Sequence, residues 1–209
     1  MDAATDWVVD GGRYALDFDG SNDYVLINRN TFFDTIEIFT LSAWIKTSSP
    51  GGSFRTIVSK DKTFALSLLN SVVATYDWTA NASISSGVNV ADGKWHLVQV
   101  AVNSGATNAS AFFVDGVNAG SAFTYSVQTK NLTNDVTIFS ALNNANLPVA
   151  ENVNGQLGEL VFHSRRIALT EARQMYQIGR GGMLTPRRRR RAYFAGSGLR
   201  RRLLLTGQV

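Results

Sequence analysis

The feature that most constrains this chain is a series of short apolar runs separated by turn-forming residues. The clearest case is the dipeptide Asp115-Gly116, which joins the runs Ala111–Val114 and Val117–Ala122. A two-residue β-hairpin turn favours positive φ at both central positions, and Asp and Gly tolerate that conformation. The dipeptide therefore predicts a hairpin at this point of the chain.

The same pattern continues along most of the sequence. Leu41, Ala43 and Ile45 alternate with polar or amphipathic neighbours, which is typical of a strand with one buried face. The other predicted strands are Tyr14–Asp17, Tyr24–Asn28, Phe54–Ser59, Thr63–Leu69, Val72–Trp78, Trp95–Val102, Val136–Ala141 and Gln156–His163. Many short strands at close spacing favour a two-sheet antiparallel sandwich over strands linked by helices. The predicted fold class is all-β.

One helix is predicted near the C-terminal end. Thr170 is a suitable N-cap, Glu171 favours the positive end of the helix dipole, and Gly179 suits a C-terminal cap. Gly181-Gly182 follows as a flexible joint. We therefore divide the chain into an N-terminal segment (1–13), a β-sandwich (14–181) and an arginine-rich C-terminal arm (182–209).

The net charge of +4 conceals an asymmetry between the body and the arm. Eight of the 20 basic residues lie after residue 182, where there is no acid, so the body holds 12 basic against 16 acidic residues. Such an asymmetry is typical of an interaction arm. Because the chain has no cysteine and its first residues lack the pattern of a secretion signal, we expect a protein folded in a cytosol, without disulfides or a membrane span.

Several motifs, in this order, resemble laminin-G-like domains of the concanavalin-A-like superfamily. They are Ala15-Leu16-Asp17-Phe18-Asp19-Gly20, Asp23-Tyr24-Val25, Phe39-Thr40-Leu41-Ser42-Ala43-Trp44-Ile45-Lys46, Ile57-Val58-Ser59-Lys60, Asp92-Gly93-Lys94-Trp95-His96-Leu97-Val98, Phe113-Val114-Asp115-Gly116 and Gly155-Gln156-Leu157-Gly158-Glu159-Leu160-Val161-Phe162. The resemblance covers residues 14–178 and implies a jelly roll. Members of this superfamily include sugar-binding modules, adhesion modules and domains attached to enzymes.

The resemblance also implies a structural calcium ion. Such domains often bind it between the turn after the first strand and an acid on the last strand, here Asp19, Asn22 and Asp23 with Glu159. Calcium takes six to eight oxygen ligands. Where the family often has two consecutive acids, this chain has Gly158-Glu159. The alternative is that the three turn residues only form the turn.

A glycan site is the second candidate. Trp44 falls on the polar side of its strand, Trp78 ends another strand, and the loop at 143–154 contains Asn143, Asn144 and Asn146. Loops on a rigid sandwich often carry ligand sites. The alternative is that Trp44 packs in or beside the core and that the asparagines are ordinary loop residues.

Catalysis is not expected. Glycoside hydrolases need two carboxyl groups about 5–5.5 Å apart for retention. The four glutamates, Glu37, Glu151, Glu159 and Glu171, have no pair at the spacing of one strand face. We therefore predict a protein that is not an enzyme.

The arm is the third candidate site, as a surface that binds a partner. It contains Arg187, Arg188, Arg189, Arg190, Arg191, Tyr193, Phe194, Arg200, Arg201 and Arg202. Its apolar residues favour docking on protein over binding to a phosphate backbone. A helix followed by such an arm is similar to the ends of some phage and prophage laminin-G-like proteins. This implies a virion protein, assembled in the host cytoplasm, that decorates a capsid or belongs to a tail or fibre.

Three functions remain open at this point. The first is a structural or adhesion module, anchored in an assembly of other protein chains by the arm and displaying a sandwich that binds cell-surface glycans. The second is a stand-alone carbohydrate-binding module. In the third, the arm contacts packaged nucleic acid, which clustered arginines bind without sequence preference.

Overall fold

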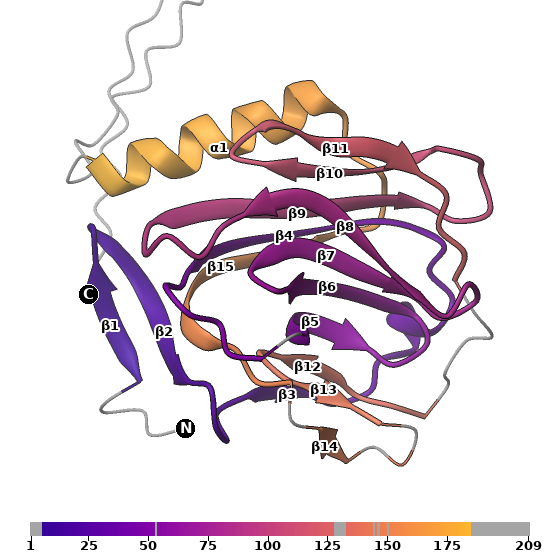
Figure 1. The fold of residues 1–209 in the computed structure, drawn as a ribbon, viewed down its shortest axis with the longest axis horizontal. Helices are drawn as coiled ribbons and strands as arrows, with labels where there is room; N and C mark the ends of the chain where they lie inside the picture. The colour runs from indigo at the N-terminus through magenta and orange to yellow at the C-terminus, as the bar shows by residue number, and fades with distance from the viewer. Residues whose placement is uncertain are drawn as a thin grey trace, which may run out of the picture.

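The computed structural model describes residues 6–184 apart from 53, 128–132, 144, 146 and 150. Two antiparallel sheets lie face to face, and one helix runs along the outer side of the larger sheet (Figure 1). The bounds of the first strands are β1 Trp7–Asp10, β2 Arg13–Asp19, β3 Val25–Ile27, β4 Ile38–Lys46, β5 Phe54–Lys60, β6 Phe64–Leu69, β7 Val72–Asp77 and β8 Ala82–Asn89. The later elements are β9 Trp95–Asn103, β10 Ser110–Val114, β11 Val117–Phe123, β12 Val136–Ile138, β13 Ala141–Leu142, β14 Pro148–Val149, β15 Asn154–His163 and helix α1 Leu169–Leu184. A short 3₁₀ helix, Thr31–Asp34, follows β3.

The seven-stranded sheet has the order β1-β2-β15-β4-β9-β10-β11, and the six-stranded sheet has the order β3-β12-β5-β6-β7-β8. The last long strand, β15, lies between β2 and β4, so strands from both ends of the body meet in the middle of one sheet. A two-stranded sheet, β13-β14, lies at one end. The prediction of an all-β, two-sheet antiparallel sandwich with one C-terminal helix is confirmed for the described residues.

The core lies between the two sheets. On β4, Phe39, Leu41, Ala43 and Ile45 face inward and are almost fully buried. The period-two alternation predicted for this strand is therefore correct. The outward residues Thr40, Ser42 and Trp44 are buried as well, because α1 and the segment before it lie over this face.

Three strand predictions differ from the structure. Trp7–Asp10 forms β1 and pairs with β2, so this part of the N-terminal segment belongs to the sheet. Ala82–Asn89 forms the edge strand β8, whose polar sequence gave no strand pattern. The predicted strand Val136–Ala141 is interrupted at Phe139, which has a φ of 59°.

The helix also differs from its prediction. It begins at Leu169, so Thr170 lies within the first turn instead of capping it. The side chain of Glu171 accepts a hydrogen bond from the Ala168 N–H at 3.0 Å, as in one half of a capping box. Gly179 lies inside the helix, which continues to Leu184, past the predicted boundary at 181. Within the described residues, no helix is long and apolar enough to cross a membrane.

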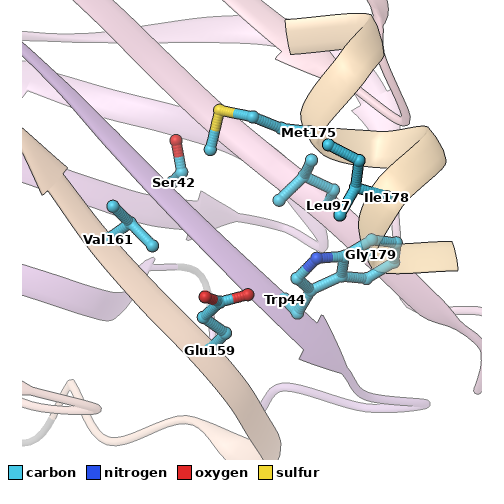
Figure 2. Close-up of a pocket in the computed structure, with 8 residues that line it drawn as sticks. All are labelled: Ser42, Trp44, Leu97, Glu159, Val161, Met175, Ile178 and Gly179. Atoms are coloured by element: carbon cyan, nitrogen blue, oxygen red, sulfur yellow. The ribbon is translucent and has the colours of Figure 1, made fainter. Parts of the chain in front are cut away.

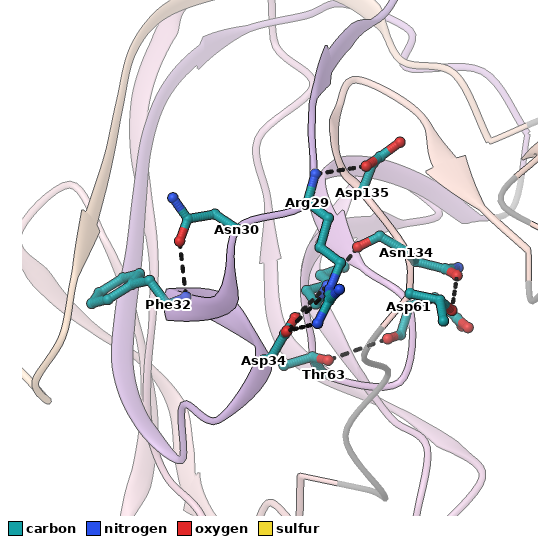
Figure 3. A network of polar contacts seen from close by, with 10 residues as sticks. Arg29, Asn30, Phe32, Asp34, Asp61, Thr63, Asn134 and Asp135 are labelled. Atoms are coloured by element: carbon teal, nitrogen blue, oxygen red, sulfur yellow. Dashed lines mark hydrogen bonds and ion pairs between the residues drawn. The ribbon is translucent and has the colours of Figure 1, made fainter.

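A buried polar network closes one end of the sandwich beside β3, β12 and β5 (Figure 3). Asp34 accepts hydrogen bonds from the Arg29 guanidinium at 2.7 and 3.1 Å. The Lys60 ammonium donates to the Asn134 carbonyl and pairs with Asp34. No pattern in the sequence predicted this network.

Candidate functional site

Helix α1 lies on the outer face of the seven-stranded sheet because that face is apolar under its first turns. Ala101 from β9 and Phe113 from β10 point outward and pack against Ile167 and Ala172. The β10–β11 turn approaches the helix so closely that a Cβ atom on Gly116 would lie 2.8 Å from the Cα atom of Arg173. The helix is thus held tightly at this turn.

The C-terminal half of the helix covers Trp44. The Trp44 indole is 2% exposed and stacks on Tyr176, with ring centroids 5.7 Å apart. The Arg13 guanidinium lies over the indole, 4.3 Å from its centroid, and donates to the Gly179 carbonyl at 3.1 Å. Trp44 therefore offers no open face to a sugar, and its prediction as a glycan-binding residue is wrong.

Burial lowers the pKa of the Arg13 guanidinium, although the charge of Glu159 acts in the opposite direction. Arg13 also lies 5.5 Å from the ring centroid of Trp95. Its position between Trp44 and Trp95 places it beside two hollows, one lined by each tryptophan.

The smaller hollow lies between α1 and the outer sheet face, and Figure 2 shows the residues that line it. Its volume is about 170 Å³, and its lining is largely apolar. The lining residues are Ser42, Trp44, Leu97, Glu159, Val161, Met175, Ile178 and Gly179. Glu159 is the one carboxylate among them, so this hollow holds no pair of acids for hydrolysis.

The larger hollow, which we call the cationic cleft, has a volume of about 450 Å³ and is open to solvent. It is lined by Gly11, Lys46, Gly93, Lys94, Trp95, Tyr176 and Arg180. Three cations and two aromatic rings thus surround one concave surface. Small-molecule sites are typically lined by aromatic and apolar side chains together with a few convergent polar groups.

Two of the three cations of the cleft have acidic partners. Lys46 forms an ion pair with Asp10, and Lys94 pairs with Asp92 at 2.9 Å. Arg180 is exposed and forms no ion pair with an acidic residue of the described part of the chain. A ligand with acceptor oxygens would find the Arg180 guanidinium exposed.

His96 holds the turn that carries Lys94 in place through contacts with two aspartates. His96 Nδ1 lies 2.8 Å from a carboxylate oxygen of Asp115, and Nε2 lies 3.0 Å from Asp92. The hydrogen bond to Asp115 is the main cause that raises the pKa of His96, against the effect of burial. The Asp92 pKa is lowered by its hydrogen bonds to Lys94 and His96. The turn before β9 is therefore joined to the β10–β11 turn.

The residues predicted to bind calcium do not come together. In the register of β15 with β2, Asn154 lies opposite Asp19, whereas Glu159 is five positions further along, roughly 16 Å away at ~3.3 Å per residue. Glu159 lines the smaller hollow instead. The prediction of a site shared by Glu159 and the turn is therefore wrong.

The carboxylates of Asp19 and Asp23 instead accept hydrogen bonds from backbone N–H groups of their own turn. Asp19 Oδ1 accepts from the N–H groups of Ser21 and Asn22 at 2.7 and 3.3 Å. Asp23 accepts from the Asp19 N–H at 3.1 Å. Within the described residues, no group of three or more His, Cys, Asp or Glu side chains is placed to hold a metal. The residues present do not fit the calcium site that the resemblance implied.

The remaining predicted glycan residues lie on separate turns. Trp78 follows β7, is half-buried, and packs edge-on against Tyr76 with ring centroids 5.4 Å apart. Asn143 follows β13, and its side-chain oxygen accepts from the N–H groups of Ala145 and Leu147. Asn144 and Asn146 lie outside the described residues.

The predicted arm residues from Arg187 to Arg202 also lie outside the described residues. The cationic cleft combines a hairpin turn, two strands and a helix, and no local sequence pattern predicted it. One indication was present in the sequence. Tyr176 and Arg180 are four positions apart on the predicted helix, so they share a face.

Comparison with known families identifies the body of the chain. A family model of the laminin-G type, described as the concanavalin A-like lectin/glucanases superfamily, matches residues 19–173. No curated protein matches the sequence.

Solved structures share the fold at low sequence identity. A heptameric SAP-like pentraxin from Limulus polyphemus matches with a TM-score of 0.61 and 14% identity, covering 81% of this chain and 84% of the pentraxin chain. Domain 4 of AbnA, a GH43 extracellular arabinanase from Geobacillus stearothermophilus solved with arabinotriose, has a TM-score of 0.59 and 13% identity, with 82% and 80% covered. The binding domain of Paraclostridial Mosquitocidal Protein 1 has a TM-score of 0.60 and 14% identity, with 84% of this chain but 46% of that chain covered. These similarities show a lectin-like fold.

Proposed function

We propose that this chain, which belongs to the laminin-G-type family of the concanavalin A-like lectin/glucanases superfamily, is a non-enzymatic carbohydrate-binding module. The observation that carries the proposal is the cationic cleft, where Trp95 and Tyr176 lie beside Lys94 and Arg180 around one open hollow. Aromatic rings bind the apolar faces of sugars, and cationic donors bind their oxygens. The similarity to an arabinanase domain solved with arabinotriose supports this assignment.

The positions of three of the four glutamates support a role without catalysis. Glu171 is paired with Arg165 and caps α1, and Glu151 accepts a hydrogen bond from the Thr56 hydroxyl at 2.8 Å. Glu159 stands beside Arg13 in the smaller hollow. Hydrolysis of a glycoside by the purified protein, abolished by Glu159→Gln, would contradict the proposal.

Sugar binding is tested on the ¹⁵N-labelled full chain. The four tryptophans each give one indole N–H signal, and none of them lies in the arm. We expect arabinotriose or another oligosaccharide from a panel of neutral and carboxylated sugars to shift the Trp95 signal. A shift confined to Trp78 would place the site at the turn after β7, and no shift with any sugar would contradict the proposal.

Exposed cations provide the matched variants. Lys94→Ala and Arg180→Ala should weaken sugar binding, because each removes donors from the cleft. Arg166→Ala removes an exposed arginine before the opposite end of α1 and serves as the control. Equal losses in all three variants would indicate a general effect of charge rather than a site.

We further propose that the arm anchors this module in a larger assembly, for which a phage virion is the best candidate, as capsid decoration or as part of a tail or fibre. The charge asymmetry between the acidic body and the arginine-rich arm supports an anchoring role. Replacing Arg187–Arg191 by serine in the full chain should prevent incorporation into the particle. Unchanged incorporation would show that the arm is not the anchor.

Nucleic acid is the competing partner for the arm. Binding to a phosphate backbone falls steeply with salt, because counterions are released for every phosphate neutralised. Leucines gain nothing from such a backbone, and the arm carries Leu203, Leu204 and Leu205. An interaction of the arm that survives high salt therefore favours a protein partner.

A further inference from the structure

The β1–β2 hairpin carries three large apolar side chains that are exposed to solvent. Trp7, Val9 and Tyr14 are 60%, 66% and 75% exposed. Trp7 and Val9 are two residues apart on β1, and Val9 is the cross-strand partner of Tyr14. They therefore share one face of the sheet. We call this set the hairpin patch.

The hairpin patch faces the core side of the seven-stranded sheet, beyond the reach of the six-stranded sheet. Leu16 is the partner of Trp7, lies on the same face and packs against the core. On the opposite face, Arg13 contacts Trp44 and Gly179. No described part of the chain covers the patch, which is thus a continuation of the core surface of the kind that marks interaction sites.

The backbone of β1 adds a second recognition element. Strand β1 is at the edge of its sheet and pairs with β2 alone among the described strands. Asp10 and Arg13 flank the two-residue turn Gly11-Gly12, so they form the hydrogen-bonded pair nearest the turn. In an antiparallel pair, hydrogen-bonded residues alternate along the strand, so Val8 also bonds to β2. The backbone N–H and C=O groups of Val9 and Trp7 therefore point away from β2, toward the free edge. A free edge of this kind accepts an additional extended strand.

The segment that follows α1 has matching chemistry. Residues 185–209 contain eight arginines, no acid, and the apolar residues Tyr193, Phe194, Leu203, Leu204 and Leu205. The body of the chain, residues 1–182, is acidic, with 12 basic against 16 acidic residues. The charges of the arm and of the body are therefore complementary, and the apolar residues of the arm match the apolar hairpin patch.

The geometry favours a second copy of the chain over the same copy. Helix α1 ends beside the β1–β2 hairpin on the outer face of the sheet (Figure 1). The hairpin patch, in contrast, is on the core side, as the packing of Leu16 shows. A segment leaving Leu184 has to pass around the edge of its own β1 to reach its own patch. The arm of a neighbouring molecule has no such restriction.

Resting on the anchoring role proposed for the arm, we propose that residues 185–209 of one copy bind the hairpin patch of a second copy and add a strand to the free edge of β1. Such a contact joins two different surfaces of the same chain. Head-to-tail contacts of this type generate rings when the rotation closes and filaments when it does not. The partner of the arm is then the protein itself.

The absence of cysteine permits a direct test by disulfide cross-linking of full-length chains. One variant carries Val9→Cys, and a second, with a tag that changes its mass, carries Leu204→Cys. The control replaces Val9→Cys by Val117→Cys, an exposed valine (54%) on β11 at the opposite edge of the same sheet. We expect a several-fold higher yield of the mixed dimer for the Val9→Cys pair than for the control pair.

Two results would overturn the inference. One is an equal yield for the two pairs. The other is a doubly substituted chain, with Val9→Cys and Leu204→Cys, that forms its disulfide within one molecule at a rate independent of concentration. Sugar binding measured on the same cross-linked samples shows whether the carbohydrate proposal stands or fails separately, because the cationic cleft does not include the patch residues.

A second measurement does not depend on introduced cysteines. In sedimentation experiments we expect the full chain to associate as its concentration rises, and Val9→Ser to lower the association constant by about tenfold, as for a central interface residue. Val117→Ser should leave it unchanged. A full chain that stays monomeric, or equal effects of the two serine variants, would contradict docking at the patch.

Discussion

The ammonium nitrogen of Lys60 lies 3.1 Å from a carboxylate oxygen of Asp34, and both side chains are almost completely removed from water, at 0% and 3% exposure. Arg29 covers the other carboxylate oxygen, and the Asn134 carbonyl accepts from Lys60. Strands β3, β12 and β5, which lie side by side, are thereby fastened at one end of the sandwich. A buried pair in which one partner is removed leaves an uncompensated charge.

Lys60→Met is therefore expected to lower the free energy of unfolding by about 3–5 kcal/mol, the range for breaking a buried ion pair. Lys62→Met, two residues along the chain at a half-buried position, is the matched control and should change stability little. Urea unfolding followed by tryptophan fluorescence measures both variants. A loss of similar size in the two variants would show that the pair with Asp34 is not the cause.

Acid should weaken the same network. Burial opposes ionisation of Asp34, but hydrogen bonds and charges from Arg29 and Lys60 outweigh it and lower its pKa. A carboxyl group whose pKa is lower in the folded state stabilises the fold above its unfolded pKa of about 3.9 and loses this contribution as the pH falls through the folded pKa. The stability difference between the parent chain and Asp34→Asn, measured by thermal unfolding, should therefore shrink as the pH is lowered below about 4. A difference that grows in acid would reverse the assigned direction.

The histidine between Asp92 and Asp115 should respond in the opposite sense. Its pKa is raised in the folded state, chiefly by the hydrogen bond to Asp115. The protonated His96 therefore contributes fully to the stability of the fold below its unfolded pKa of about 6.5. This contribution is lost as the pH rises through the pKa of the folded state. The stability advantage of the parent chain over His96→Gln should be larger near pH ~5.5 than near pH ~8.5.

His163 is the internal control for this measurement. Burial, followed by the charge of Arg165, lowers its pKa, so its protonation opposes folding in acid. His163→Gln should consequently gain stability relative to the parent chain as the pH falls. If both histidine variants change in the same direction with pH, the pairing of His96 with the two aspartates does not control its titration.

The alternation of β4 was predictable because it depends on local sequence, and so was the hairpin at Asp115-Gly116. The burial of Trp44 was not, because it depends on where α1 packs, which involves residues more than 100 positions away. Likewise, the separation of Glu159 from the turn at Asp19 follows from the register of β15 with β2 and from a bulge in its pairing with β4. The sequence contains no pattern that specifies either.

Two other differences have distinct physical origins. The hairpin of β1 and β2 turns at Gly11-Gly12, but its first strand has only four residues, too few for a clear alternation. Strand β8 carries serine or asparagine at four of its eight positions, because an edge strand that is largely exposed needs few apolar side chains. Short or polar edge strands acquire their stability from their neighbours rather than from their own sequence.

Gly179 provides the sharpest test of how α1 is positioned over Trp44. In an exposed helix, replacing Gly by Ala is expected to stabilise by about 1 kcal/mol. Here a Cβ atom on Gly179 would lie 2.5 Å from Trp44 Nε1 and 2.6–2.7 Å from two of its ring carbons. The Trp44 ring is held between Arg13 and Tyr176, so it has little room to move.

Gly179→Ala should therefore destabilise the protein and expose the indole, which a red shift of tryptophan emission and a lower midpoint of thermal unfolding would report. Gln177→Ala, at an exposed position of the same helix, should leave the emission unchanged. A Gly179→Ala variant as stable as Gln177→Ala would mean that α1 does not pack against Trp44 at this distance.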